Sequence, residues 1–92
     1  MNKSQLIEDL AQKTSLPLKK AEEVFNSVFG DIEKALIRDE RVEIRGFGSF
    51  KIKEYDGYKG RNPKTGQIIE VNPKKLPFFK VGKELKERVD IY

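Results

Sequence analysis

A chain of 92 residues forms at most one domain, and because 37% of its residues are charged we expect it to complete its core by pairing with a second copy. The absence of cysteine excludes disulfide bonds and thiolate metal sites, and histidine is absent as well. The net charge of +4 makes a negatively charged partner the first class to consider.

The positive charge is concentrated in the second half of the chain. Residues 1–46 contain eight Lys or Arg against nine Asp or Glu, whereas residues 47–92 contain eleven against six. Within residues 51–83 the ratio is nine to three. Solvated surface lysines are the ordinary explanation of such a segment, and a polyanion such as nucleic acid is the functional one.

Two helices are predicted in the first half. Asn2 and Gln5 have the spacing of a capping box, so a first helix should run from about Lys3 to Thr14. Pro17 suits the first turn of a second helix. Apolar residues then recur every three or four positions and predict a broad buried stripe: Ala21, Val24, Phe25, Val28, Phe29, Ile32, Ala35 and Leu36. Gly30 interrupts this stripe, either because another backbone approaches it or because it is simply tolerated.

The apolar period then changes to two, which predicts antiparallel strands. Val42, Ile44, Phe50 and Ile52 alternate around a turn at residues 46–48, and apolar residues return between Ile68 and Val81. Pro73 and Pro77 imply either a sheet edge or a bulge, so we expect this return strand to be exposed along part of its length. After Gly82, the sequence KELKERV predicts a short final helix with Leu85 and Val89 on one face. The predicted fold class is α+β: two helices, a three-stranded antiparallel sheet with a long hairpin, and a final short helix.

The sequence gives no support for an enzyme. Without His or Cys, the acid-base and nucleophilic candidates are Asp, Glu, Lys, Tyr and Ser, and none form a recognisable constellation. We therefore expect no catalytic residues, no cofactor, no metal and no small-molecule substrate. The amino terminus has charges within its first turns and no apolar run, so we expect neither a signal peptide nor a membrane span, and a cytoplasmic protein.

Residues 60–66, GRNPKTG, combine turn formers with positive charge. Asn62 and Pro63 suit the first two positions of a type I turn, and Gly66 suits the left-handed residue that closes a longer hairpin with a bulge. Turn chemistry does not explain why Arg61 and Lys64 flank the proline. A rigid apolar residue between cations is typical of wedges that enter the minor groove and partly unstack a base step.

Three motifs together carry a close family resemblance. GFGSFKIKE (46–54), GRNPKTG (60–66) and PFFKVGKELKERV (77–89) resemble the bacterial HU and integration host factor family of DNA-bending proteins, which are known examples of minor-groove wedges. The order of elements fits over essentially the whole chain. The resemblance implies an intertwined homodimer, or a heterodimer with a related subunit, that is associated with the nucleoid and supports recombination, replication and transcription.

The resemblance also implies roles for particular residues. Residues 1–92 would form a single domain, with a dimerisation base and first strand over 1–45 and a DNA-binding arm over 53–75. Pro63 would enter a base step, with Arg61, Asn62 and Lys64 in the groove around it. The remaining candidates would contact phosphates, along the arm (Lys53, Lys59, Lys74 and Lys75) or on the body (Lys3, Lys80, Lys83 and Lys86). Glu54 and Asp56 depart from the richly basic arm of many members, and their effect on arm contacts is left open.

Two alternatives of other classes remain at this point. The basic hairpin could capture an acidic protein surface by strand addition. The phenylalanines could instead stack the bases of RNA or single-stranded DNA. Against stacking, Phe47, Phe50 and Phe79 fall in the apolar periodicity and are expected in the core and dimer interface, and Tyr55 and Tyr58 are expected to pack on neighbouring strands.

Overall fold

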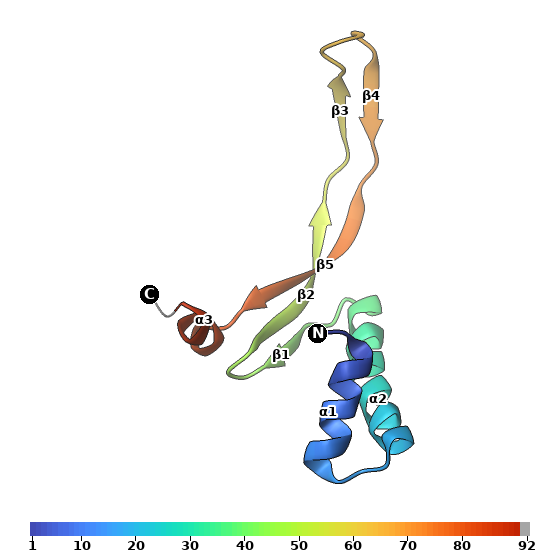
Figure 1. Cartoon of the computed structure of the whole chain (residues 1–92). Coiled ribbons are helices and arrows are strands. Elements are labelled where there is room, and N and C mark those ends of the chain that lie inside the picture. Colours follow the sequence, from blue (N-terminus) through green and yellow to red (C-terminus); the bar gives the residue numbers. More distant parts are fainter. Residues whose placement is uncertain (91–92) are drawn as a thin grey trace. The chain divides into compact units, whose positions relative to one another are not determined.

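The computed structural model describes residues 1–90. The chain contains two compact units, Met1–Ala35 and Leu36–Tyr92. Its elements follow the predicted order: two helices, five strands and a short final helix (Figure 1). The predicted α+β fold class is therefore confirmed. Among the described residues, no helix is long and apolar enough to cross a membrane.

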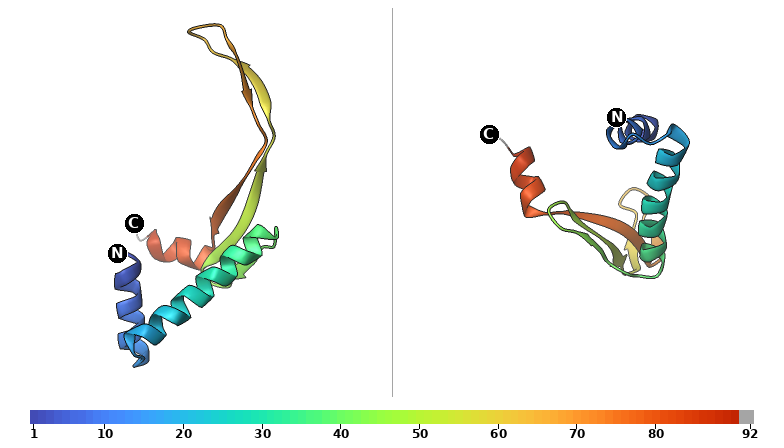
Figure 2. Two further views of the ribbon diagram at one scale, coloured as in Figure 1. Left: turned by 90° about the vertical axis from the view of Figure 1, so that its right-hand side faces the viewer. Right: turned by 90° about the horizontal axis from the view of Figure 1, so that it is seen from below.

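The first unit is a pair of helices that meet at the loop around Ser15 (Figure 2). Helix α1 (Lys3–Thr14) begins with the predicted capping box, in which Asn2 Oδ1 accepts from the Gln5 backbone N–H and Gln5 Oε1 accepts from that of Asn2, both at 2.9 Å. Helix α2 (Leu18–Ile37) begins one residue after Pro17, whose carbonyl accepts the Ala21 N–H at 3.0 Å. The Pro17 carbonyl thus closes the first turn of the helix, in agreement with the predicted place of this proline at the start of α2.

The apolar stripe of α2 is not buried within its own chain. Of the eight predicted residues, only Ala21 and Ala35 are buried, and Val28 and Phe29 expose 52% and 51% of their surface. No atom lies within 4 Å of a Cβ built on Gly30, so no other backbone of the described residues approaches it. Phe29 and Gly30 instead line a hollow of about 500 Å³ together with Leu6 and Phe25.

The second unit is built on a three-stranded antiparallel sheet of order β1-β2-β5. Its strands are β1 (Val42–Ile44), β2 (Gly48–Tyr55) and β5 (Lys74–Val81). β1 and β2 are joined by a three-residue turn, Arg45 to Phe47, in which the Phe47 N–H donates to the Ile44 carbonyl. Gly48, which we expected in that turn, is the first residue of β2. Pro77 lies on the edge strand β5, as predicted, where its missing N–H costs least.

The hairpin arm is a second, separate ladder. β3 (Tyr58–Arg61) pairs with β4 (Ile68–Val71), and neither strand is continuous with the three-stranded sheet. The interruption lies at Asp56 and Gly57 on one side and at Asn72 and Pro73 on the other (Figures 1 and 2). A Cβ on Gly57 would lie 2.7 Å from the Val71 carbonyl oxygen and 2.8 Å from Pro73 Cδ. Only glycine therefore fits at position 57 in this interruption of the arm.

Helix α3 (Lys83–Val89) follows β5 directly and lies at the end of that strand opposite the arm (Figure 1). The Gly82 N–H donates to the Phe47 carbonyl at 2.9 Å, which ties the start of this helix to the turn between β1 and β2. Leu85 is half-buried, whereas Val89, predicted on the same face, exposes 70% of its surface.

Candidate nucleic-acid interface

The tip of the arm is a six-residue loop held by its own hydrogen bonds. Asn62 Oδ1 accepts the Lys64 N–H at 2.9 Å, the Asn62 carbonyl accepts the Gly66 N–H at 2.7 Å, and the Asn62 N–H donates to the Gln67 carbonyl at 2.7 Å. Gly66 has φ +74°, the left-handed conformation predicted for it. The bond from Asn62 to Gly66 spans five residues, which is compatible with the longer hairpin closed by a left-handed glycine that we expected.

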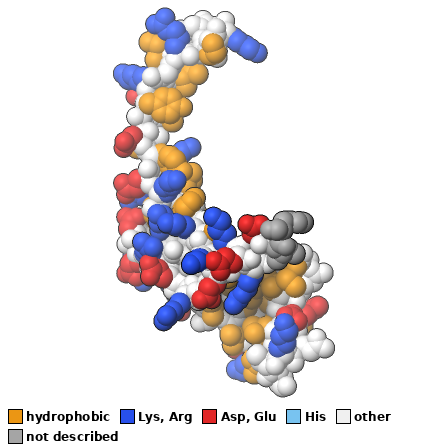
Figure 3. Space-filling view, turned by 90° about the vertical axis from the view of Figure 1, so that its left-hand side faces the viewer, with side chains coloured by type: hydrophobic (Ala, Val, Ile, Leu, Met, Phe, Trp, Pro, Cys, Tyr) orange, Lys and Arg blue, Asp and Glu red, His pale blue; other side chains and the backbone are white. Residues whose placement is uncertain are grey.

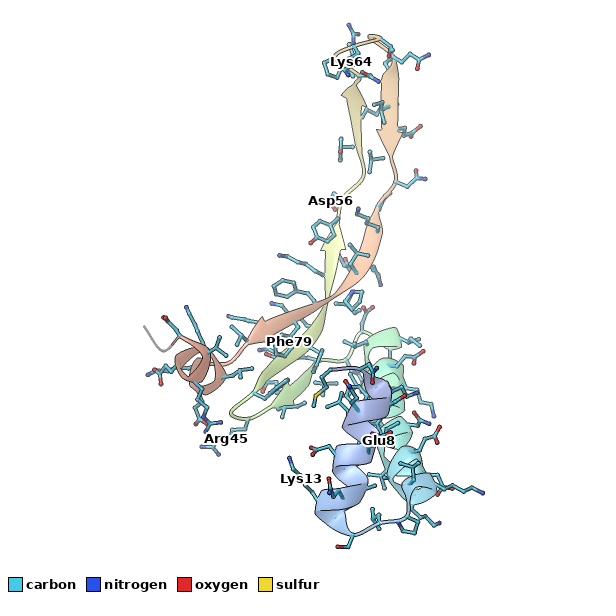
Figure 4. The ribbon with its side chains drawn as sticks, viewed as in Figure 1. Glu8, Lys13, Arg45, Asp56, Lys64 and Phe79 are labelled. Atoms are coloured by element: carbon cyan, nitrogen blue, oxygen red, sulfur yellow. The ribbon has the colours of Figure 1, made fainter. Side chains whose placement is uncertain are left out.

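This loop presents Pro63 outward. Pro63, Lys64 and the preceding Arg61 are all exposed, and Lys64 marks the tip in Figure 4. Space-filling side chains show Lys and Arg at the tip and along the arm, among hydrophobic groups (Figure 3). Because the Asn62 side-chain oxygen accepts a hydrogen bond inside the loop, the amide NH₂ is the part of that side chain left to reach a ligand.

Cross-strand register places the arm side chains on two faces, because residues directly opposite each other share a face. Lys59 lies opposite Glu70 and Arg61 opposite Ile68, so both cations belong to one face. Tyr58 and Gly60 belong to the other, where a Cβ on Gly60 would meet the Tyr58 ring at 3.5 Å. Tyr58 therefore leans over its neighbour in the strand, although 64% of it remains exposed.

The same rule separates the two faces of the three-stranded sheet near the arm. Four lysines lie on one face of β2 and β5, together with Ser49, Tyr55, Leu76 and Phe78; they are Lys51, Lys53, Lys74 and Lys80. We call this side of β2 and β5 the lysine face. Two of its cations lie over the Phe78 ring, at 4.5 Å from the centroid for Lys53 Nζ and 5.8 Å for Lys51 Nζ. Lys74 Nζ lies 5.8 Å from the centre of the Tyr55 ring.

The opposite side of the same strands, the apolar face, carries Phe50, Ile52, Pro77, Phe79 and Val81. The Phe79 ring centre lies 4.9 Å from that of Phe50 and 5.3 Å from that of Phe47 in the turn (Figure 4). These three rings pack on one another, as expected of core residues, yet Phe79 and Phe47 still expose 37% and 44% of their surface. A partner could therefore still cover this face.

Lys75 is separated from the other arm lysines. It lies opposite Glu54, on the side of the apolar face, and its Nζ is 2.9 Å from Asp39 Oδ2 and 3.5 Å from Glu54 Oε1. The hydrogen bond to Asp39 and the nearby carboxylate charges raise the pKa of Lys75 above its ordinary value. Glu54 thus acts on Lys75, whereas Asp56 stands exposed at the interruption of the arm (Figure 4).

The remaining candidates lie on helices. Lys3, at the start of α1, places Nζ 5.9 Å from the centre of the Phe25 ring. Lys83 and Lys86 lie on exposed positions of α3. Lys3 belongs to the first compact unit and the other two to the second.

Most of the candidate cations have no competing carboxylate. Ten of the twelve predicted site residues are Lys or Arg, and within residues 1–90 only Lys75 among these ten takes part in an ion pair. Charges of this kind are available to an external anion. Within residues 1–90, no group of three or more acidic side chains could hold a metal ion.

Sequence reasoning missed two members of the lysine face, Lys51 and Phe78. Both could have been found from alternation, since Lys51 has the same parity as Lys53 and the opposite parity to Phe50 and Ile52. Phe78 was obscured by its neighbour, because the tandem Phe78 and Phe79 reads as one apolar run although the two rings must point to opposite faces.

Comparison with known proteins agrees with this geometry. A family model described as bacterial DNA-binding protein matches residues 1–90. Integration host factor subunit beta from Histophilus somni strains 2336 and 129Pt is 48% identical over 93 residues, covering all of this chain and 99% of the relative.

Solved structures give the same result. A cocrystal structure of Anabaena HU with DNA has a TM-score of 0.87 at 35% identity and covers both chains completely. A mutant HU from Thermotoga maritima has a TM-score of 0.73 at 31% identity, covering 98% of this chain and all of that one. This chain therefore belongs to the HU and integration host factor family of bacterial DNA-binding proteins, which bind and bend DNA and are not enzymes.

Proposed function

We propose that the arm tip bends duplex DNA by inserting Pro63 into a base step of the minor groove. The observation that carries this proposal is the tip loop, which holds an exposed proline between Arg61 and Lys64 on a hydrogen-bonded scaffold. Proline suits a wedge because its ring is apolar and its φ is already fixed, so little order is lost on insertion. The neighbouring cations favour the negative potential of the groove.

The unpaired cations of the arm and sheet hold phosphates on either side of the bend. Lys53, Lys74 and Lys80 share the lysine face, and Lys59 shares an arm face with Arg61. Lys3, Lys83 and Lys86 take further phosphates along the bent duplex. Such contacts supply affinity without reading sequence, and the deformability of the duplex supplies what site preference there is. The cocrystal of the similar Anabaena HU with DNA supports DNA as the ligand of these cations.

The working form is a dimer, which provides two arms for one duplex. Phe47 and Phe79 of the sheet unit and Val28 and Phe29 of the helical unit are exposed in the single chain, and each unit thus lacks part of its cover. The similar Histophilus somni proteins are described as subunits, which favours a related but different partner over a second copy. Binding to chromosomal DNA would place this dimer in the nucleoid.

One competition experiment distinguishes this function from its two alternatives. Labelled duplex is bound at one salt concentration and challenged with unlabelled duplex, single-stranded DNA, RNA or an acidic protein. DNA bending through the tip predicts that duplex competes best. A ranking led by single strands would identify a stacking protein, and a ranking led by the acidic protein would identify a protein-interaction module.

A further inference from the structure

Phe78 occupies an unusual place on the lysine face. It lies directly across the ladder from Lys51 and diagonally from Lys53, and both ammonium groups lie over its ring, at 5.8 Å and 4.5 Å from the centroid. The ring is 38% exposed. Within residues 1–90, neither lysine forms an ion pair with a carboxylate.

The ring is not a core residue that happens to be exposed. Its neighbour Phe79 contacts Phe47 and Phe50 on the apolar face, so alternation sends Phe78 to the other side of the sheet. Of the ring interactions described within residues 1–90, those of Phe78 are with ammonium groups alone. The ring at this position therefore contacts positive charges rather than other aromatic rings.

Two ammonium groups held on one ring lack an anion that would neutralise both of them. The negative face of the ring attracts each of them and restricts side chains that would otherwise sample many rotamers. The two positive charges nevertheless repel each other, and no carboxylate described here neutralises them. A single anion that contacts both ammonium groups offsets that repulsion. The two side chains are already ordered in the free protein, so binding the anion costs little further side-chain entropy.

We propose that Phe78 is a positioning residue that holds Lys51 and Lys53 as one two-ammonium site for a phosphodiester of duplex DNA. This inference rests on the proposed function, because the lysine face is where phosphates are expected. It adds two residues to that surface and assigns the ring a role distinct from base stacking. Its geometric part concerns the free protein and is independent of whether DNA is bent.

The first test measures the geometry without DNA. Protons near a ring face are shifted upfield, so in the proton spectrum of the free protein the ε-methylene signals of Lys51 and Lys53 should lie upfield of the remaining lysines. Phe78→Leu, which keeps an apolar side chain but removes the ring, should return both signals to the ordinary range, and Phe78→Tyr should keep them shifted. Ordinary shifts in the wild-type protein would overturn the proposal.

The second test measures affinity for a short duplex by fluorescence anisotropy at several salt concentrations. Phe78→Leu should weaken binding about five-fold, and Phe78→Tyr should restore it. In a Lys51→Gln, Lys53→Gln background, whose salt slope should be about two units shallower, Phe78→Leu should have no further effect. The proposal is overturned if Phe78→Leu binds duplex like the wild type, or weakens the doubly substituted protein equally. A selective loss of single-strand binding would also overturn it, since Phe78 would then be a stacking platform.

The outcomes of these two tests do not depend on the bending mechanism. If the wild-type protein binds duplex without bending it, the proposed wedge fails while the effect of Phe78→Leu on affinity stands. If bending depends on Pro63 but Phe78→Leu changes neither affinity nor the lysine signals, only the positioning role fails.

Discussion

Lys75 Nζ lies 2.9 Å from Asp39 Oδ2, a contact that joins the start of β5 to the loop after α2 across 36 positions of sequence. Asp39 has φ +61°, so its backbone is held in a conformation uncommon for residues other than glycine. Any phosphate that contacts Lys75 must compete with this carboxylate and with Glu54 at 3.5 Å.

Asp39→Asn should therefore tighten binding to duplex DNA, by about two- to five-fold at low salt, because it frees Lys75 and removes one negative charge. Asp31→Asn, on the exposed surface of α2, removes the same charge without touching Lys75 and serves as the control. Affinities measured by anisotropy should separate the two variants. Equal affinity for both would mean that Lys75 takes no part in binding.

The same contact makes a prediction about alkaline pH. Asp39 raises the pKa of Lys75 above 10.5, so the ion pair contributes its stability fully below about that pH. The contribution is lost as the pH rises through the higher folded-state value. Wild type and Asp39→Asn should thus lose their difference in unfolding midpoint above that pH, and keep it at pH 8. A difference that persists after Lys75 is neutral would assign it to the loop conformation instead.

Gly66 should be needed for the shape of the tip and not for the fold. Its φ of +74° would cost an alanine about 1 kcal/mol, and the loop would relax away from the geometry that presents Pro63. Gly66→Ala should reduce DNA bending while leaving the thermal midpoint of the body nearly unchanged. Gly66→Asn is the matched control, because asparagine tolerates this conformation, and it should keep most of the bend. Unaltered bending by Gly66→Ala would show that tip geometry is not limiting.

Lys83 should contribute affinity that is independent of sequence. It is exposed on α3 and takes part in no ion pair within residues 1–90. Lys83→Ala should weaken binding to every duplex alike and lower the slope of log affinity against log salt by about one unit. Lys13→Ala is the matched control, because Lys13 Nζ is paired with Asp9 Oδ2 at 2.9 Å. An unchanged slope for Lys83→Ala would remove this residue from the interface.

The unfolding midpoint should depend on protein concentration. Four apolar residues expose more than a third of their surface in the single chain: Val28 and Phe29 of α2, and Phe47 and Phe79 of the sheet unit. A dimer that covers them is stabilised by mass action, so the midpoint should rise by several degrees over a hundred-fold increase in concentration. If the chain alone shows no such rise, adding a related subunit should restore it. A midpoint independent of concentration in both cases would mean that no dimer forms.

Local chemistry made much of the fold predictable. The capping box of Asn2 and Gln5, the left-handed Gly66 and the alternation through Phe50 and Ile52 all follow from short-range rules, and the structure contains each of them. The broad stripe of α2 was also found, but its burial was not, since only Ala21 and Ala35 of the stripe are buried in the single chain.

The division of the arm and the faces of its lysines could not be predicted. Lys74 and Lys75 read as a basic pair, yet the register sends them to opposite faces, and the breaks at Gly57 and Pro73 prevent counting from one ladder to the next. The partner of Lys75 is Asp39, which no local pattern links to it. Phe78 was missed for a different reason, since Phe78 and Phe79 form one apolar run in the sequence although alternation places them on opposite faces.

The central claim is that the arm tip bends DNA by a proline wedge, and fluorescence transfer between the ends of a short duplex tests it most directly. Wild-type protein should raise the transfer, Pro63→Ala should lose most of that rise while retaining most of its binding, and Pro73→Ala, at the interruption of the arm, should keep it. All three are compared at concentrations that saturate a parallel binding assay. Equal transfer by wild type and Pro63→Ala, or no rise with either, would contradict the wedge.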